Sequence, residues 1–205
     1  MSNSIIFYTN PMSRGQIIRW MLEEAGADYQ DQIIEYGPTM KGPEYLVINP
    51  MGKVPAIKHG DNIVTECSAI CAYLADAFPE ANLCPANDDR ADYYRWMFFA
   101  AGPFESAVTN NSLGFTLDEA QQRSAGYGNY DLVMKVVDEL LGTRDYICGE
   151  KFTAADVYVG SQIDFGLQFK SIQETDNFNA YAERLRSREA YKKAKAIDMA
   201  LMPKS

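Results

Sequence analysis

A short stretch in the first third of the chain combines residue types that could hold a small zwitterionic molecule. Pro55 interrupts a run of β-forming residues, where a proline weakens a strand because it lacks the N–H that the ladder needs. Further along, a helical pattern opens at Cys67, directly after the acidic Glu66. A helix N-terminus offers free N–H groups to a carboxylate, and a glutamate can pair with an ammonium group. The alternative is a proline at a strand edge before an ordinary helix start, and the residues alone leave both open.

Other kinds of chemistry are less well supported. The chain of 205 residues has a single histidine, His59, so a His-based metal site or a Ser-His-Asp triad is not expected. Its four cysteines form no C-x-x-C pair, and we expect reduced thiols in a cytoplasmic protein. The formal net charge is -9 without a cluster of Lys and Arg, which argues against a nucleic-acid or anionic-membrane surface. No apolar run approaches the ~18 residues that span a bilayer, and no signal peptide is expected.

The elements that must position these residues differ between the two ends of the chain. Up to residue 78, the patterns follow the order β-α-β-α-β-β-α, which predicts an α/β module with a parallel first pair of strands. The expected elements are strands over 4–10 and 29–36, a helix over 13–25, a short helix over 44–48, a hairpin turning at Gly60-Asp61, and a helix over 67–78.

The composition changes after residue 78. Residues 79–89 carry two prolines and no periodicity, which is typical of a linker. Beyond them every periodic segment has helical spacing, and we find no convincing strand. The expected organisation is therefore an α/β domain over 1–78, a linker over 79–89 and an all-helical domain over 90–205.

Four motifs, in this order, resemble those of the cytosolic, bacterial-type glutathione transferases. "NPMGKVPAI" (49–57) is similar to the segment that carries the family's cis-proline, and "TECSAICAYL" (65–74) is similar to its E/Q-S-x-A-I-x-x-Y-L motif. "GEKFTAADVYV" (149–159) resembles a helix start in the second domain, and "NAYAERLRSREAY" (179–191) resembles the C-terminal W-x-x-R-x-x-x-R-P-A-Y. Together they span nearly the whole chain. The resemblance implies a thioredoxin-like domain followed by an all-helical domain.

The resemblance also implies glutathione as co-substrate, with no metal. A cis peptide before Pro55 would turn the backbone N–H and C=O of Val54 outward, where an extended tripeptide can pair with them as an extra strand. Glu66 would hold the ammonium of the γ-glutamyl end, and the N–H of Cys67 its carboxylate. Cys67 replaces the family's usual serine, and a thiol is the weaker hydrogen-bond donor. The expected glutathione-binding residues are Arg14, Lys53, Val54, Pro55, Glu66 and Cys67.

Two hydroxyls compete to stabilise the glutathione thiolate. A free thiol has a pKa of ~8.5, and lowering it by about 2 units requires the site to favour the anion by roughly 2.7 kcal/mol. Ser13 lies where the first helix begins, beside Arg14, and matches the serine of the serine-type classes. Tyr8 ends the first strand and matches the tyrosine of the tyrosine-type classes. We favour Ser13 and keep Tyr8 as the alternative; a plain helix cap and a packed strand-end tyrosine are their purely structural roles.

The resemblance places a hydrophobic electrophile between the two domains. The candidate residues are Trp96, Phe99, Phe104, Phe115 and Tyr127, although aromatic residues at helical spacing are more often core. The expected protein is a homodimeric glutathione transferase, acting on small hydrophobic electrophiles and also on organic peroxides. The alternatives are a non-catalytic binding or scaffold protein of the same fold, and a glutathione-dependent thiol reductase, which usually needs a cysteine at the Ser13 position.

Overall fold

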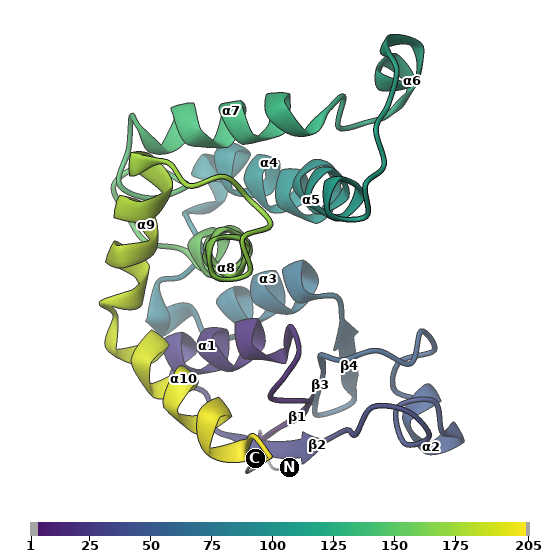
Figure 1. The fold of residues 1–205 in the computed structure, drawn as a ribbon. Coiled ribbons are helices and arrows are strands. Elements are labelled where there is room, and N and C mark those ends of the chain that lie inside the picture. Colours follow the sequence, from purple (N-terminus) through teal and green to yellow (C-terminus); the bar gives the residue numbers. More distant parts are fainter. Residues whose placement is uncertain (1–3, 204–205) are drawn as a thin grey trace. The chain divides into compact units, whose positions relative to one another are not determined.

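A computed structural model describes residues 4–203 and divides the chain into two compact units. The first unit contains the chain up to Cys84 together with the C-terminal segment from Ser187, and the second runs from Pro85 to Arg186. Figure 1 labels their helices and strands. The first boundary falls inside the expected linker over 79–89.

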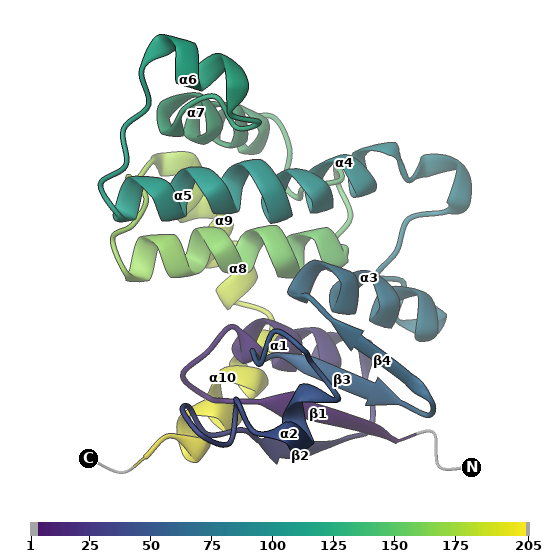
Figure 2. The same ribbon diagram turned by 90° about the vertical axis from the view of Figure 1, so that its right-hand side faces the viewer.

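The first unit is built on a four-stranded sheet with the strand order β2-β1-β3-β4 (Figure 2). The strands are β1 (Ile5–Thr9), β2 (Tyr29–Ile33), β3 (Ala56–His59) and β4 (Asn62–Thr65). β1 pairs in parallel with β2 and antiparallel with β3, and β3 pairs antiparallel with β4. The expected βαβ unit and hairpin are therefore confirmed, although β2 ends at Ile33, before the expected limit of 36.

Two helices cover one face of this sheet. α1 (Gly15–Ala25) and α3 (Cys67–Ala77) lie side by side over the strands (Figure 2). α1 buries Ile17, Ile18 and Met21, which recur on one side of a helix of 3.6 residues per turn. It ends at Gly26, whose φ of 62° is favourable for glycine. A short helix, α2 (Pro43–Leu46), precedes the hairpin.

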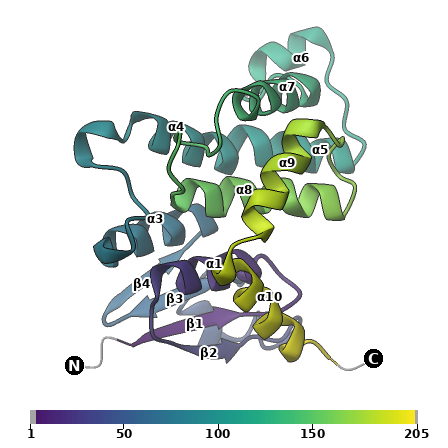
Figure 3. The same cartoon turned by 90° about the vertical axis from the view of Figure 1, so that its left-hand side faces the viewer.

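The last helix departs from the expected division of the chain. α10 (Glu189–Leu201) belongs to the first unit, where it packs against α1 (Figure 3). The physical cause is a buried ion pair, in which Arg19 Nε of α1 lies 2.7 Å from Asp198 Oδ1 of α10. The Trp20 and Tyr191 rings also meet edge to face, with centroids 5.1 Å apart. Periodicity identifies such a segment as a helix, but it does not reveal which unit the helix packs on.

The second unit is helical. Its elements are a 3-10 turn over Asn87–Asp89, α4 (Ala91–Phe99), a π-helical turn over Ala100–Phe104, α5 (Glu105–Ser112), α6 (Glu119–Ser124), α7 (Tyr130–Leu141), α8 (Ala154–Gln168) and α9 (Asp176–Arg186). No strand occurs among its residues, apart from an isolated bridge between Tyr146 and Gly149. The π-turn contains Pro103, which lacks the N–H that a regular helix would use. α8 is buried along most of its length and forms the core.

The start of α8 is fixed by a buried aspartate. Asp156 accepts hydrogen bonds from the backbone N–H groups of Ile147 (2.7 Å) and Thr153 (2.8 Å), and from the hydroxyl of Tyr181 (2.8 Å). Thr153 and Asp156 form the capping box that the sequence indicates. Burial raises the pKa of Asp156 to about 6, against the opposing effect of these hydrogen bonds.

This raised pKa makes stability depend on pH in a definite direction. The folded-state pKa of about 6 exceeds the ordinary value of 3.8, so the folded state binds the proton more tightly than the unfolded state. The stability that the protonated Asp156 contributes is therefore present at low pH and is lost as pH rises through about 4 to 6. Across this window, the free energy of unfolding of the wild-type protein should fall by about 2–3 kcal/mol more than that of Asp156→Asn. Urea unfolding at several pH values measures both. A parallel pH dependence in both proteins would contradict the assignment.

Candidate functional site

The loop between β1 and α1 presents the Ser13 hydroxyl in a defined orientation. Ser13 Oγ donates to the carbonyl of Asn10 (2.7 Å) and accepts from the N–H of Gly15 (2.9 Å). The Ser13 N–H also donates to the Asn10 carbonyl, at 3.1 Å. The hydroxyl can therefore turn its proton toward a ligand while that carbonyl keeps a donor. The bond from the Gly15 N–H also gives Ser13 the role of a helix cap, since α1 begins at Gly15.

The same loop is held at several of its polar groups. The Asn10 side chain donates to the carbonyl of Ile34 (3.1 Å) and accepts from the N–H of Met12 (3.0 Å). The carbonyl of Met12 accepts from the hydroxyl of Tyr36, and that of Pro11 accepts from a side chain of α1. The loop is therefore ordered before any ligand binds, and this reduces the entropy cost of binding.

Tyr8, the competing hydroxyl, lies on the neighbouring part of β1. It is half-buried and packs against the cluster of Ile34, Met40 and Tyr45, as Val54 does. Its ring centroid lies 5.8 Å from that of Tyr45. Tyr8 and Val54 therefore share one apolar support.

The Val54-Pro55 peptide is cis, as the resemblance implied. The ladder between β1 and β3 begins at Ala56, so Val54 lies outside it. The preceding carbonyl, that of Lys53, accepts from the Tyr45 hydroxyl and from Asn49 Nδ2, both at 2.7 Å. These two bonds fix the backbone directly before Val54.

Glu66 has a backbone conformation that is unusual for a glutamate. Its φ is 67° and its ψ is 122°, although it is not a glycine, and such a conformation costs of the order of 1–3 kcal/mol. It is exposed, stands directly before α3, and is followed by the half-buried Cys67. The Cys67 Sγ lies 3.9 Å from the carbonyl oxygen of Arg14. The start of α3 and the start of α1 are therefore neighbours.

The sheet register brings most of these residues to one end of the sheet. Ala56 pairs with Tyr8 on one side and with Thr65 on the other. The end of β1, the cis-proline before β3 and the Glu66 turn after β4 therefore lie in a row. Tyr8, Pro55 and Glu66, which lie in this row, are among the residues that the sequence analysis expects at a glutathione site. The Lys53 and Arg14 side chains are exposed.

The predicted electrophile residues lie in the second unit and differ in burial. Trp96 and Phe104 are buried in its core, at 2% and 1% exposure, and the Trp96 ring meets that of the half-buried Phe99. Phe115 is 63% exposed, and the half-buried Tyr127 accepts a hydrogen bond from Asn110. Two of the candidates thus have a packing role within their own unit.

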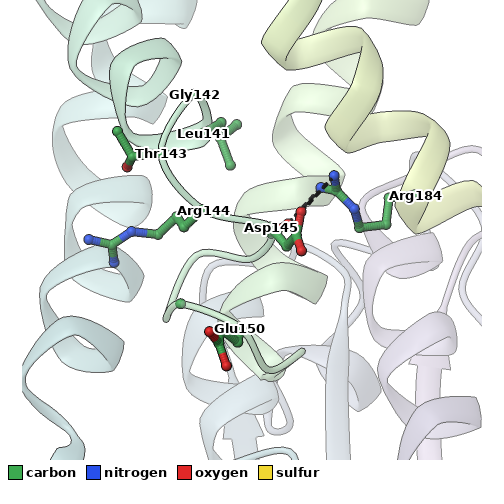
Figure 4. A pocket seen from close by; sticks show the side chains of 8 residues that line it. Leu141, Gly142, Thr143, Arg144, Asp145, Glu150 and Arg184 are labelled. Carbon is green, nitrogen blue, oxygen red and sulfur yellow. Dashed lines mark hydrogen bonds and ion pairs between the residues drawn. The ribbon is translucent and has the colours of Figure 1, made fainter.

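The second unit also contains a polar pocket of about 530 Å³ (Figure 4). Its lining residues are Leu141, Gly142, Thr143, Arg144, Asp145, Gly149, Glu150 and Arg184. Its arginines already bind carboxylates: Arg184 pairs with Asp145 at 3.0 Å, and Arg144 pairs with Asp92 at 2.7 Å. None of the predicted site residues lines this pocket.

Residues 4–203 contain neither a candidate metal centre nor a candidate membrane-spanning helix. No three His, Cys, Asp or Glu side chains there are grouped so that they could hold a metal ion. No helix in this range combines the length and the apolar character needed to cross a membrane.

Comparison with known proteins identifies the family of the chain. The family "Glutathione S-transferase, N-terminal domain" matches residues 3–76. Glutathione S-transferase GstA of Escherichia coli O157:H7 is 28% identical over 151 residues, covering 72% of this chain and 74% of the relative. Glutathione S-transferase 1 of Zea mays is 30% identical over 150 residues, covering 66% of this chain and 68% of the relative.

The fold agrees with these similarities. The crystal structure of a glutathione transferase from Methylococcus capsulatus superposes with a TM-score of 0.79 at 25% identity, covering 96% of this chain and 99% of that one. Elongation factor 1-gamma of Artemia salina is 30% identical over 128 residues, but only 29% of its length is covered. Sequence similarity over most of the chain, a shared fold and the cis-proline motif agree, and the chain belongs to the glutathione S-transferase family.

Proposed function

We propose that the protein is a glutathione transferase whose Ser13 hydroxyl stabilises the thiolate of bound glutathione. The observation that carries this proposal is the ordered loop that holds Ser13 directly before α1, at the sheet end where the cis-proline and the start of α3 also lie. A hydroxyl donor and a helix N-terminus together favour an anion at this position.

The peptide part of glutathione would bind along the cis-proline loop. Its backbone pairs with Val54, which lies outside the ladder of β3 and adjoins a rigidly held carbonyl. The γ-glutamyl carboxylate binds the N–H of Cys67 at the start of α3, and its ammonium pairs with the exposed Glu66. Lys53 and Arg14 add positive charge for the anionic peptide. The strained backbone of Glu66 is consistent with a ligand-binding turn.

The bound thiolate forms a bond to an electrophilic carbon and displaces its leaving group, such as the chloride of a chloronitrobenzene. Organic peroxides are a second substrate class: two glutathione molecules reduce the peroxide to an alcohol and water and are oxidised to glutathione disulfide. The Ser13 hydroxyl donates to the sulfur while the Asn10 carbonyl retains the Ser13 N–H as its donor. Tyr8 is the alternative donor, since it shares its apolar support with Val54. Among the aromatic residues of the second unit, the half-buried Phe99 and the exposed Phe115 are the proposed contacts for the hydrophobic electrophile, because Trp96 and Phe104 are buried in the core.

A second candidate function is that of a non-catalytic binding or scaffold protein of the same fold, which the similarity to elongation factor 1-gamma favours. A thiol reductase is less well supported, because the expected cysteine position holds Ser13. Retention on immobilised glutathione, followed by a panel of electrophiles, peroxides and disulfides including a chloronitrobenzene, separates these functions. Conjugation supports the transferase, disulfide reduction supports the reductase, and retention without turnover supports the binding protein.

Cys67 should be the most readily alkylated of the four cysteines when the site is empty. Burial raises the pKa of Cys71 well above its ordinary value and that of Cys148 to about 12, so little thiolate forms at either. Cys67 is half-buried at the start of α3, where glutathione would cover it. Mass spectrometry after brief iodoacetamide treatment should show Cys67 labelled first and protected by glutathione. Equal labelling of all four thiols without protection would remove Cys67 from the site.

We further propose a homodimer, with the α/β part of one subunit against the helical part of the other. The second unit exposes Tyr94 and Phe98, one turn apart on α4, at 47% and 73%. Sedimentation at micromolar concentration should show a species of twice the 23.0 kDa chain mass, and Phe98→Glu should weaken it. A wild-type protein that sediments only at 23.0 kDa would contradict the proposal.

A further inference from the structure

The amide of Gln16 connects the C-terminal helix to the loop that carries Ser13. Lys195 Nζ of α10 donates to Gln16 Oε1 at 2.7 Å, and Gln16 Nε2 donates to the carbonyl of Pro11, also at 2.7 Å. Pro11 lies two residues before Ser13 and directly after Asn10, whose carbonyl binds the Ser13 hydroxyl. A residue in the last turns of the chain is thus two hydrogen bonds away from the loop.

The chemistry of Lys195 determines the orientation of this amide. An ammonium group only donates hydrogen bonds, so it binds the oxygen of Gln16 and leaves the NH₂ group facing Pro11. The positive charge also polarises the amide, which strengthens the N–H donor at its other end. Without Lys195, the amide would lose the contact that holds it in this orientation.

α10 itself is fixed firmly enough to act as a support. Asp198, one turn beyond Lys195, binds the buried Arg19 at 2.7 Å. At the other end of the helix, Arg188 pairs with Glu24 at 2.6 Å. Lys195 is therefore placed by a helix that is anchored to α1 on both sides of it.

We propose that Lys195 and Gln16 are positioning residues, through which the docked C-terminal helix holds the Ser13 loop in its thiolate-stabilising geometry. The Asn10 and Tyr36 side chains hold the loop from the strand side, and Gln16 holds it from the side of α10. Ser13 Oγ must be placed to within a fraction of an ångström to stabilise a thiolate. This inference rests on the proposed role of Ser13.

The test compares Gln16→Glu, Lys195→Ala and Lys195→Arg with a control, Lys192→Ala. Gln16→Glu keeps a partner for Lys195 but removes the donor to Pro11. Lys192 binds Glu189 within its own helix, so its removal changes the charge of α10 without touching Gln16. The readouts on the full chain are hydrogen exchange of the Ser13 and Gly15 amides, the pKa of bound glutathione and the unfolding temperature.

In Gln16→Glu and Lys195→Ala, the Ser13 and Gly15 amides should exchange faster than in the wild type, and the pKa of bound glutathione should be higher. Turnover at neutral pH should fall by about 3- to 10-fold, because small displacements of a positioned group are costly. Lys195→Arg and Lys192→Ala should both have the wild-type exchange rates, glutathione pKa and turnover. A change in unfolding temperature alone, with loop exchange and thiol pKa as in the wild type, would overturn the inference.

Failure of the proposed function gives a different result. If Ser13→Ala leaves the pKa of bound glutathione unchanged, Ser13 is not the thiolate donor. Hydrogen exchange of the loop in Gln16→Glu and Lys195→Ala then still decides whether α10 positions it. Should Lys195→Ala fail to fold, Gln16→Glu alone decides, since it leaves the α10 contact in place.

Discussion

Replacing Asp198 by alanine should destabilise the first unit by about 3 kcal/mol or more, because it leaves a buried charge without its closest partner. Arg19 is fully buried and binds Asp198 at 2.7 Å and Asp31 at 2.9 Å. Burial alone disfavours its charged form, but the hydrogen bonds to Asp198 and Asp31 outweigh this and hold the pKa of Arg19 above its ordinary value. The guanidinium still stays charged when Asp198 is removed, because arginine is not deprotonated in proteins and Asp31 remains beside it.

Chemical denaturation of Asp198→Ala, with Lys192→Ala as a control on the exposed side of the same helix, measures this effect. Asp31 is 26% exposed and compensates in part, and Arg19 Nη2 and Asp198 Oδ2 have no hydrogen-bond partner among the described residues. The pair is thus imperfect, and the double variant Arg19→Leu/Asp198→Leu should be more stable than Asp198→Ala. A loss below about 0.5 kcal/mol, the usual size for a surface substitution, would show that α10 is not held by this pair.

The largest effect on activity is expected for Ser13→Ala, which should lower turnover by ten-fold or more with a modest loss of glutathione affinity. The substitution removes the only side-chain hydroxyl of the 10–14 loop. The loop keeps its other bonds, those of Asn10 and of the Met12 carbonyl, so binding of the peptide survives. Steady-state kinetics over a range of glutathione concentrations separates the two effects.

Tyr8→Phe is the matched control for this substitution. It removes one hydroxyl and keeps the ring that packs against Tyr45. If Ser13→Ala is close to wild type and Tyr8→Phe loses its activity, the two roles must be exchanged.

Much of the fold follows from local patterns in the sequence. The spacing of Ile17, Ile18 and Met21 predicts α1, and the hairpin signal at Gly60-Asp61 predicts the pairing of β3 with β4. The proline in a strand pattern, together with the resemblance, predicts the cis peptide at Pro55. These features depend on neighbouring residues, which a single sequence displays.

Features that depend on distant partners could not be predicted in this way. The contact of Arg19 with Asp198 joins residues 179 positions apart, and no periodicity reveals it. The sequence pattern therefore groups α10 with the other helices, whereas it packs in the first unit. Tyr181 occupies the position of the family's tryptophan, and its hydroxyl binds Asp156. The positive φ of Glu66 could not be predicted either, because glutamate rarely adopts one.

Titration of the bound thiol is the most direct test of whether this chain binds glutathione and stabilises its thiolate. The ultraviolet absorbance of the thiolate is followed against pH with wild-type protein, Ser13→Ala and free glutathione. The thiol of glutathione bound to the wild-type protein should have a pKa about 2 units below the free value of ~8.5, and the shift should be smaller for Ser13→Ala. Glutathione that binds but titrates at the free value, or that does not bind, would contradict the proposed function.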